Sequence, residues 1–115
     1  MLRSTPIRLL RAALVGCLLA LAACGPIQSA QAIREGQKSL ETARLAEAEQ
    51  LAPYHFHRAL AYLEMAKRKS GFSEFEVSQE YAKVAKVAAD QAVVNARKRQ
   101  ALKLILEQRR LKGAP

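Results

Sequence analysis

The sequence predicts an all-α protein, a long antiparallel helical hairpin that follows a cleaved signal helix. Half of the 115 residues are hydrophobic, but only 5% are aromatic, with five Gly and four Pro. That composition is typical of long helices. Apolar residues recur at helical spacing along two segments, and a Gly-containing turn separates the segments. We therefore expect one domain, 29–112, made of two arms at about 29–70 and 74–112.

The N-terminal segment has the features of a signal peptide. Arg3, Arg8 and Arg11 accompany a nine-residue apolar stretch at 12–20, and no acidic residue occurs before Glu35. Nine residues are about half of the ~20 that a transmembrane helix needs. We expect residues 1–23 to be removed from the mature chain.

The sequence Leu21-Ala22-Ala23-Cys24 resembles the lipobox of bacterial lipoproteins. The resemblance implies cleavage between Ala23 and Cys24, a diacylglycerol on the Cys24 thiol, and a further acyl chain such as palmitate on its amine. Two or more acyl chains hold a protein stably on a membrane. Gly25 rather than Asp follows, which in this class implies the outer membrane, facing the periplasm. The alternative is an ordinary secretory signal in which Cys24 is coincidental.

The first arm follows a short lipidated tether at 24–28. Ile33, Leu40 and Leu51 are 7 and 11 residues apart, so they form one slowly drifting apolar stripe. Pro53 interrupts the arm because proline lacks a backbone donor and clashes with the preceding turn. No loop long enough to reverse the chain is apparent there. We therefore expect two collinear halves, whether Pro53 kinks one helix or breaks the arm into two.

The second arm begins after Gly71, where Ser73 and Glu76 predict a capping box. Its apolar stripe is rich in alanine from Phe75 to Ala96, which allows two helices to approach closely. Residues 113–115 form the expected frayed C-terminus.

The apolar face moves nearly to the opposite side of the second arm beyond Ala96. Either the helix is interrupted near Asn95–Gln100, or its end presents an apolar strip to a second partner. We call this candidate partner surface the apolar strip. It comprises Val87, Val94, Ala101, Leu104, Ile105 and Leu111.

Positive charge is concentrated at the C-terminus. The formal charge of the chain is +9, and residues 24–96 are neutral, with nine basic and nine acidic residues. The excess lies in a set of candidate anion-binding residues that we call the basic segment. It comprises Arg97, Lys98, Arg99, Lys103, Arg109, Arg110 and Lys112.

Three interpretations of the basic segment are open. In a hairpin, Arg109 and Arg110 would lie level with Glu35, and Lys103 with Glu41, as weak surface ion pairs. Alternatively, the segment would lie beside the lipidated end against anionic lipid headgroups. The third possibility is binding to peptidoglycan, another acidic cell-wall polymer or an acidic protein. Nucleic acid is excluded as a partner by the expected compartment.

A second resemblance covers about residues 50–90. The residues that carry it are Ala52-Pro53-Tyr54, Ala59, Tyr62-Leu63, Ala66, Gly71-Phe72, Phe75-Glu76 and 82–85. This pattern resembles an uncharacterised family of small bacterial lipoproteins that combine an Ala-Pro-Tyr helix with a second, Ala-rich helix. The turn is also similar to that of a tetratricopeptide hairpin, although a solenoid needs about three repeats. The family has no assigned activity, so the resemblance implies fold and location alone.

The residues that usually carry catalysis or metal binding do not form a recognisable set. His55 and His57 are the only histidines, and their i, i+2 spacing on a helix directs them ~200° apart. Asp90 is the only aspartate, and there is no Gly-rich phosphate loop. We expect no catalytic residue, no metal and no cofactor.

The sequence therefore predicts a membrane-attached, non-catalytic scaffold or accessory subunit of the cell envelope. It would contact another envelope protein, or a second copy of itself, through the apolar strip. The alternative is an electrostatic binder of anionic membrane or cell-wall polymer that uses the basic C-terminal helix.

Overall fold

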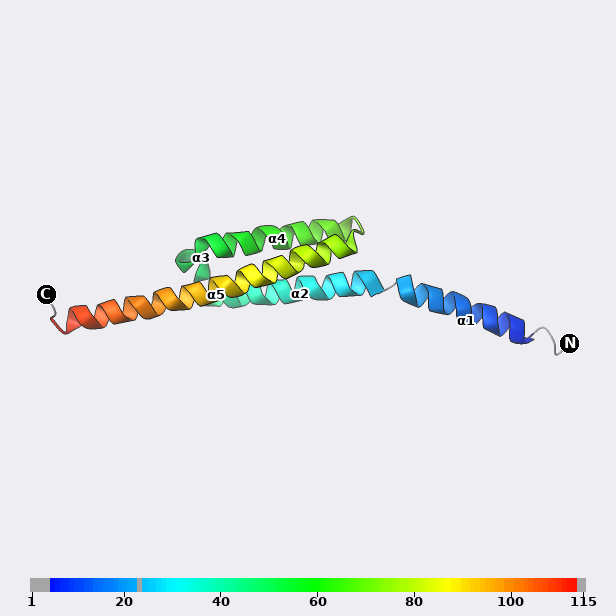
Figure 1. Ribbon diagram of the computed structural model, residues 1–115, viewed down its shortest axis with the longest axis horizontal. Helices are drawn as coiled ribbons and strands as arrows, with labels where there is room; N and C mark the ends of the chain where they lie inside the picture. The colour runs from blue at the N-terminus through cyan, green and yellow to red at the C-terminus, as the bar shows by residue number, and fades with distance from the viewer. Residues whose placement is uncertain (1–4, 23, 114–115) are drawn as a thin grey trace.

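The computed structural model describes residues 5–22 and 24–113, and within them the chain is all-α, as predicted. The helices are α1 (Thr5–Ala22), α2 (Cys24–Leu45), α3 (Ala48–Leu51), α4 (Pro53–Gly71) and α5 (Phe75–Leu111). Figure 1 shows that α2, α4 and α5 lie side by side, with α1 and the end of α5 extending from opposite ends. Ala23, at the expected cleavage position, lies outside the described residues, as do residues 1–4 and 114–115.

Helix α1 stands apart from the rest of the chain. Among the described helices it contacts only α2, and its apolar side chains, such as Leu10 and Leu19, are exposed. By length and composition, the helical stretch that begins at Pro6 is apolar enough to cross a membrane, and an N-terminal signal sequence meets the same criterion. An apolar N-terminal helix is therefore present where the signal peptide was expected.

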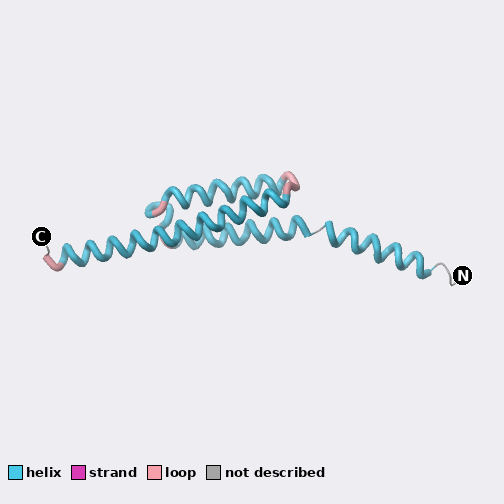
Figure 2. The backbone as a smooth tube through the Cα atoms, in the orientation of Figure 1, coloured by secondary structure: helices cyan, strands magenta, loops and turns pink. Residues whose placement is uncertain are grey.

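The prediction of a collinear first arm is wrong, because the chain reverses direction between α2 and α4. The two helices are antiparallel, and α5 runs parallel to α2 (Figure 1, Figure 2). A buried hydrogen-bond chain shows this directly: Ser29 Oγ donates to Ser78 Oγ at 2.8 Å, and Ser78 Oγ donates to the carbonyl oxygen of Ala66 at 2.7 Å. In one straight helix, Ser29 and Ala66 would be about 55 Å apart. The fold is a three-helix bundle rather than a two-arm hairpin.

The reversal takes place in a compact connection. Glu47 adopts the left-handed region, with φ 58°, immediately after α2. The single turn of α3 follows, and Ala52 leaves it with φ −139°. Pro53 is then the first residue of α4, where its missing N–H is tolerated and its fixed φ suits a helix start. Pro53 therefore neither kinks a continuous helix nor separates two collinear ones.

The core is thin and contains few large side chains. Leu40, Leu51, Phe56 and Leu63 supply its bulk from α2, α3 and α4. Helix α5 contributes mostly alanines, which form the predicted alanine stripe and are buried. They are Ala82, Ala85, Ala88, Ala89, Ala92 and Ala96.

Close approach of the helices also depends on Gly36 of α2. A Cβ atom there would lie 3.1 Å from Leu63 Cδ1 and 3.4 Å from the carbonyl oxygen of Ala82. Both distances are short, so α2 has no room for a larger residue at this crossing unless Leu63 shifts.

The turn between α4 and α5 ends α4 with a Schellman motif in place of the predicted capping box. The Glu74 N–H donates to the Lys69 carbonyl, and the Ser73 N–H donates to the Ser70 carbonyl. Ser73 takes the left-handed position, with φ 62°, and no side chain caps α5. The hydrophobic contact usual in this motif is replaced by an ion pair, Lys69 Nζ to Glu74 Oε2 at 2.8 Å, which raises the pKa of Lys69.

Helix α5 is uninterrupted through residues 95–100, so the shift of the apolar face does not mark a break in the helix. Phe75 is the first residue of α5, and a Cβ atom on Gly25 of α2 would lie 3.3 Å from its Cδ2 atom. Helices α2 and α5 therefore begin at the same level. Near the end of α2, Gln100 Nε2 donates to the carbonyl oxygen of Ala46 at 3.0 Å. All side chains from 101 to 113 are exposed. We call residues 101–113 the projecting tail.

The sequence of α5 explains why the buried core ends near Ala96. The buried stripe uses Ala85, Ala89, Ala92 and Ala96, at alternating spacings of 4, 3 and 4. Continued with the same periodicity, the stripe falls on Arg99, Lys103, Leu106 and Arg110. Three of these four positions carry a charge that could not be buried without a partner. The bundle therefore stops where the stripe becomes cationic.

Candidate functional site

All six residues of the apolar strip are exposed. Val87 and Val94 retain 56% and 51% of their accessible surface on the wall of the bundle, and Ile105 retains 50% on the projecting tail. Because α5 is one continuous helix, the strip extends from the bundle onto the tail without a break, over about 36 Å. Leu102 adds exposed apolar surface beside the strip on the tail.

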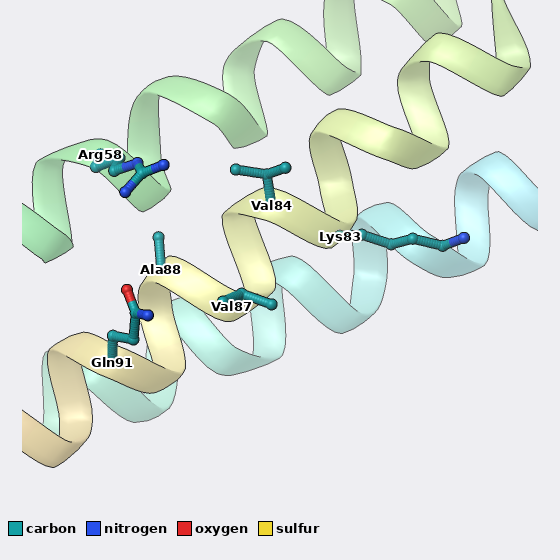
Figure 3. Close-up of a pocket in the computed structure, with 6 residues that line it drawn as sticks. All are labelled: Arg58, Lys83, Val84, Val87, Ala88 and Gln91. Carbon is teal, nitrogen blue, oxygen red and sulfur yellow. The ribbon is translucent and has the colours of Figure 1, made fainter.

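A furrow runs along the bundle part of the strip, between α4 and α5. One hollow, of about 320 Å³, is lined by Arg58, Lys83, Val84, Val87, Ala88 and Gln91. Figure 3 shows Arg58 reaching from α4 toward the α5 side chains. A second hollow, of about 470 Å³, is lined by His55, Val87, Asp90, Gln91, Val94, Asn95 and Lys98. The two hollows share Val87 and Gln91, so they form one shallow furrow.

The wall of the furrow includes a buried polar atom without a partner. Nδ1 of His55 is inaccessible to solvent and makes no hydrogen bond within the described residues. Neither His55 nor Arg58 could be placed at the strip from the sequence, because both reach it only through the packing of α4 on α5.

The cations of the basic segment divide between two faces of α5. At 100° per residue, Arg99, Lys103 and Arg110 lie within about 40° of one another, on the continuation of the core stripe and opposite the apolar strip. Arg97 lies on the Leu104 side of the strip, Lys98 and Arg109 border its other side, and Lys112 lies on the face of the strip itself. All seven cations of the basic segment are exposed.

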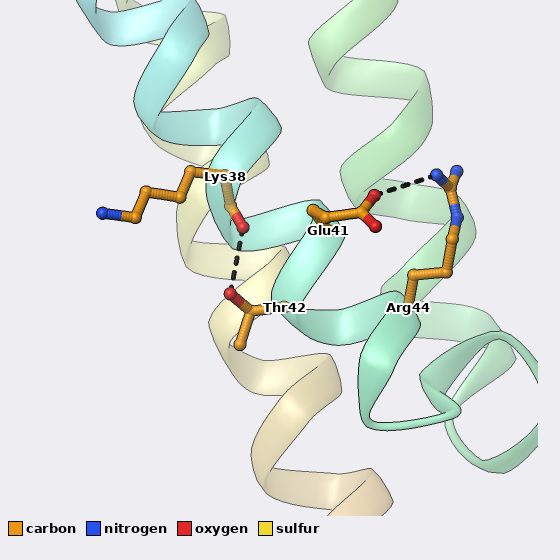
Figure 4. Close-up of polar contacts among 4 residues, drawn as sticks. All are labelled: Lys38, Glu41, Thr42 and Arg44. Atoms are coloured by element: carbon orange, nitrogen blue, oxygen red, sulfur yellow. Dashed lines mark hydrogen bonds and ion pairs between the residues drawn. The ribbon is translucent and has the colours of Figure 1, made fainter.

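The predicted pairing of the basic segment with acids of the first arm is wrong. Because α2 and α5 are parallel, Arg110 lies beyond the bundle rather than level with Glu35. Figure 4 shows Glu41 paired with Arg44 of its own helix, at 3.1 Å, and Thr42 Oγ1 donating to the Lys38 carbonyl oxygen. Across residues 5–22 and 24–113, the ion pairs are Arg44–Glu41, Lys69–Glu74 and Lys86–Asp90. None of them involves the basic segment.

Cys24 is exposed at the first residue of α2. Residues 24–28, expected to be a tether, are instead the beginning of this helix. The thiol donates to the carbonyl oxygen of Ala20 at 3.6 Å. Since α2 and α5 begin at the same level, Cys24 lies at the opposite end of the bundle from the projecting tail. The expectation that the basic segment lies beside Cys24 is therefore wrong.

The described residues contain no group of three or more His, Cys, Asp or Glu side chains close enough to share a metal ion. The two pKa shifts that stand out belong to Lys69 and Lys86, whose pKa values are raised by hydrogen bonds to Glu74 and Asp90. Both lysines are exposed, and both pairs are explained as local helix and turn contacts.

The most distinctive surface is therefore the apolar strip with its furrow and flanking cations. Comparison with known proteins found no match among family models, curated proteins or solved structures.

Proposed function

We propose that this chain is a lipoprotein of the outer membrane, held by acyl chains on Cys24 and facing the periplasm, that acts as a non-catalytic scaffold or accessory subunit in the cell envelope. The apolar strip is its docking surface. The observation that carries the proposal is that the strip stays exposed over about 36 Å of one continuous helix.

Exposure on this scale costs solubility and is uncommon in a monomer. Soluble proteins rarely expose large contiguous apolar surfaces unless these meet a partner. The strip residues are also not required by the bundle, whose core on α5 lies on the opposite face and is filled by alanine. A docking role accounts for large apolar side chains at positions that the fold does not use.

The arrangement of the two ends supports attachment through Cys24. The exposed thiol lies directly after the apolar helix α1, as the lipobox interpretation requires. The projecting tail leaves the other end of the bundle about 39 Å from the level of Gly25, and α5 ends at about 54 Å. A lipid at Cys24 would hold the molecule at one end and leave the strip free.

A second candidate function uses the cations opposite the strip. Arg99, Lys103 and Arg110 are exposed on one face of the projecting tail, and they could bind an acidic cell-wall polymer or an anionic membrane. Their distance from Cys24 favours a target other than the membrane patch that holds the lipid.

Photo-crosslinking in living cells from position 105, with position 38 on the exposed face of α2 as control, tests the first function. We expect a discrete crosslinked band at 105 and none at 38. Replacing Leu104 and Ile105 by Ser should remove the interaction, whereas replacing Arg99, Lys103 and Arg110 by Gln should leave it. No band at 105 in correctly lipidated protein would contradict a docking role and favour the electrostatic function.

A further inference from the structure

The apolar strip has the dimensions of a site for a helix. It is straight, because α5 has no break, and it covers residues 87–111, or about 36 Å. Val87, Val94 and Ala101 are seven residues apart, and Leu104 and Ile105 follow three and four residues after Ala101. Those spacings match the pattern by which one helix packs against another in a coiled coil.

The furrow gives the bundle end of the strip a concave shape. Its walls come from two helices, with His55 and Arg58 on α4 and Val87 and Val94 on α5. A rounded helix fits between two such walls, while a flat bilayer surface would touch only their crests. The shape therefore favours a helical partner over a membrane as the occupant.

The charges around the strip specify the partner further. Arg58 and Lys83 line the first hollow, and Lys98 lines the second. The acid in this region, Asp90, is already paired with Lys86 at 2.9 Å. Just before the tail, Arg97 lies on the Leu104 side of the strip, and on the tail Arg109 borders the opposite side. A helix lying in the strip would therefore place both of its flanks beside cations.

These features disfavour a second copy of the chain. Two strips that face each other would bring two sets of the same flanking cations together, with Glu107 as the single acid among residues 97–112. Like charges facing each other across a helix pair are destabilising, and charges at such positions determine which partner is chosen.

We propose that the apolar strip binds one amphipathic helix of a partner protein, with leucine-like residues on its buried face and Asp or Glu along both flanks. This inference rests on the proposed docking function and names the chemistry of its partner. The helix lies along residues 87–111, its apolar face against Val87, Val94 and Ile105 and its acids beside Lys98 and Arg109.

A designed peptide tests the proposal with the full lipidated chain in nanodiscs of neutral phospholipid. The probe is a fluorescent peptide of about four heptads with Leu at the core positions and Glu at the flanking ones, whose glutamates oppose pairing with itself at neutral pH. We expect it to bind, as measured by fluorescence anisotropy. A peptide with Lys in place of Glu should not bind, and one with Ser in place of Leu should bind at least about tenfold more weakly.

Matched variants locate the contact. Val87→Ser with Ile105→Ser should weaken binding about tenfold, whereas Leu45→Ser, at a more exposed leucine of α2, should have no effect. Lys98→Gln with Arg109→Gln should weaken binding and its dependence on salt. Arg99→Gln with Lys103→Gln, on the opposite face, should change neither.

Three outcomes would overturn the proposal: equal binding of the Ser peptide, a larger loss in the Arg99 and Lys103 variant than in the Lys98 and Arg109 variant, or binding of phosphatidylglycerol vesicles without binding of the acidic peptide. If position 105 crosslinks in cells but the peptide fails, the docking function stands and the partner is not an acidic helix. If neither occurs, the docking function itself fails.

Discussion

Ser73 and Glu47 adopt left-handed backbone conformations at the two places where the chain turns. Their φ values are 62° and 58°. This region costs a residue with a side chain roughly 1–2 kcal/mol and is normally occupied by Gly or Asn. Both turns are stable because the helices on either side pack against each other. Local preference is overruled here by tertiary contacts.

Replacing Ser73 by Gly should stabilise the protein. Glycine removes the steric cost of positive φ, partly offset by its greater freedom in the unfolded chain, so we expect a gain of about 0.5–1 kcal/mol. Urea unfolding followed by circular dichroism measures it. Ser70→Gly, inside the last turn of α4, is the matched control and should destabilise instead by about 0.5 kcal/mol. A lower midpoint for Ser73→Gly would contradict the assigned turn.

The same residues explain why the chain reversal could not be predicted from the sequence. Nothing at 46–52 supplies the Gly, Asn or polar cluster that usually indicates a turn. Pro53 is equally compatible with a kink and with the first residue of a new helix. Glu47 becomes a turn residue only because Ser29, Ala66 and Ser78 meet in the folded bundle. That contact is between distant segments and leaves no local pattern.

At the scale of elements, α5 consists of two physically different parts. Up to Gln100 it is held by the bundle, and the projecting tail has only its own backbone hydrogen bonds. An isolated helix of about eleven residues is marginal in water. The tail is helical because it continues a helix that the bundle has already nucleated, and its amides should exchange with solvent much faster than those of residues 82–96.

Ending the chain after Gln100 should therefore leave the bundle intact. We expect the helical circular dichroism signal to fall by roughly a tenth, in proportion to the helix removed, and the unfolding midpoint to stay unchanged. Ending it after Gln91 removes Ala92, Val93 and Ala96 from the core and should lower the midpoint strongly. If the first truncation also lowered it strongly, the tail would be part of the cooperative core.

The sequence was sufficient to predict two features of α5. Its alanine stripe and the rotated apolar face were both visible, because each depends on spacing within one helix, whereas the sequence left open whether the helix breaks near residues 95–100. The exposure of the apolar strip follows from that rotation, and all six residues predicted for the strip are exposed. The furrow could not be predicted, since His55 and Arg58 join it through the register of α4 on α5, which no single helix encodes.

At the scale of the whole molecule, the bundle separates the two ends that a hairpin would bring together. Parallel packing of α2 and α5 places Glu35 close to Lys86, whose pKa its charge helps to raise. Arg110 lies 24 residues further along α5, about 36 Å away. A hairpin would place Glu35 and Arg110 side by side.

Spin labels at these positions distinguish the two arrangements. In a chain with Cys17 and Cys24 replaced by Ser, labels at 35 and 110 should be separated by about 36 Å, plus the reach of the labels. Labels at 35 and 86 form the control pair and should be close together. Pulsed electron paramagnetic resonance measures both separations. A short distance for 35 and 110 would restore the hairpin and contradict the bundle.

The level starts of α2 and α5 have a consequence for the choice of partners. With Cys24 at the membrane, the tip of the tail could stand up to about 54 Å above the lipid surface. A helix tethered in the same membrane by a shorter stalk would never meet the outer part of the strip. One with matching reach would find it at a raised local concentration, because both molecules search a thin layer rather than a volume. The length of α5 would then determine which neighbouring membrane proteins can reach the strip.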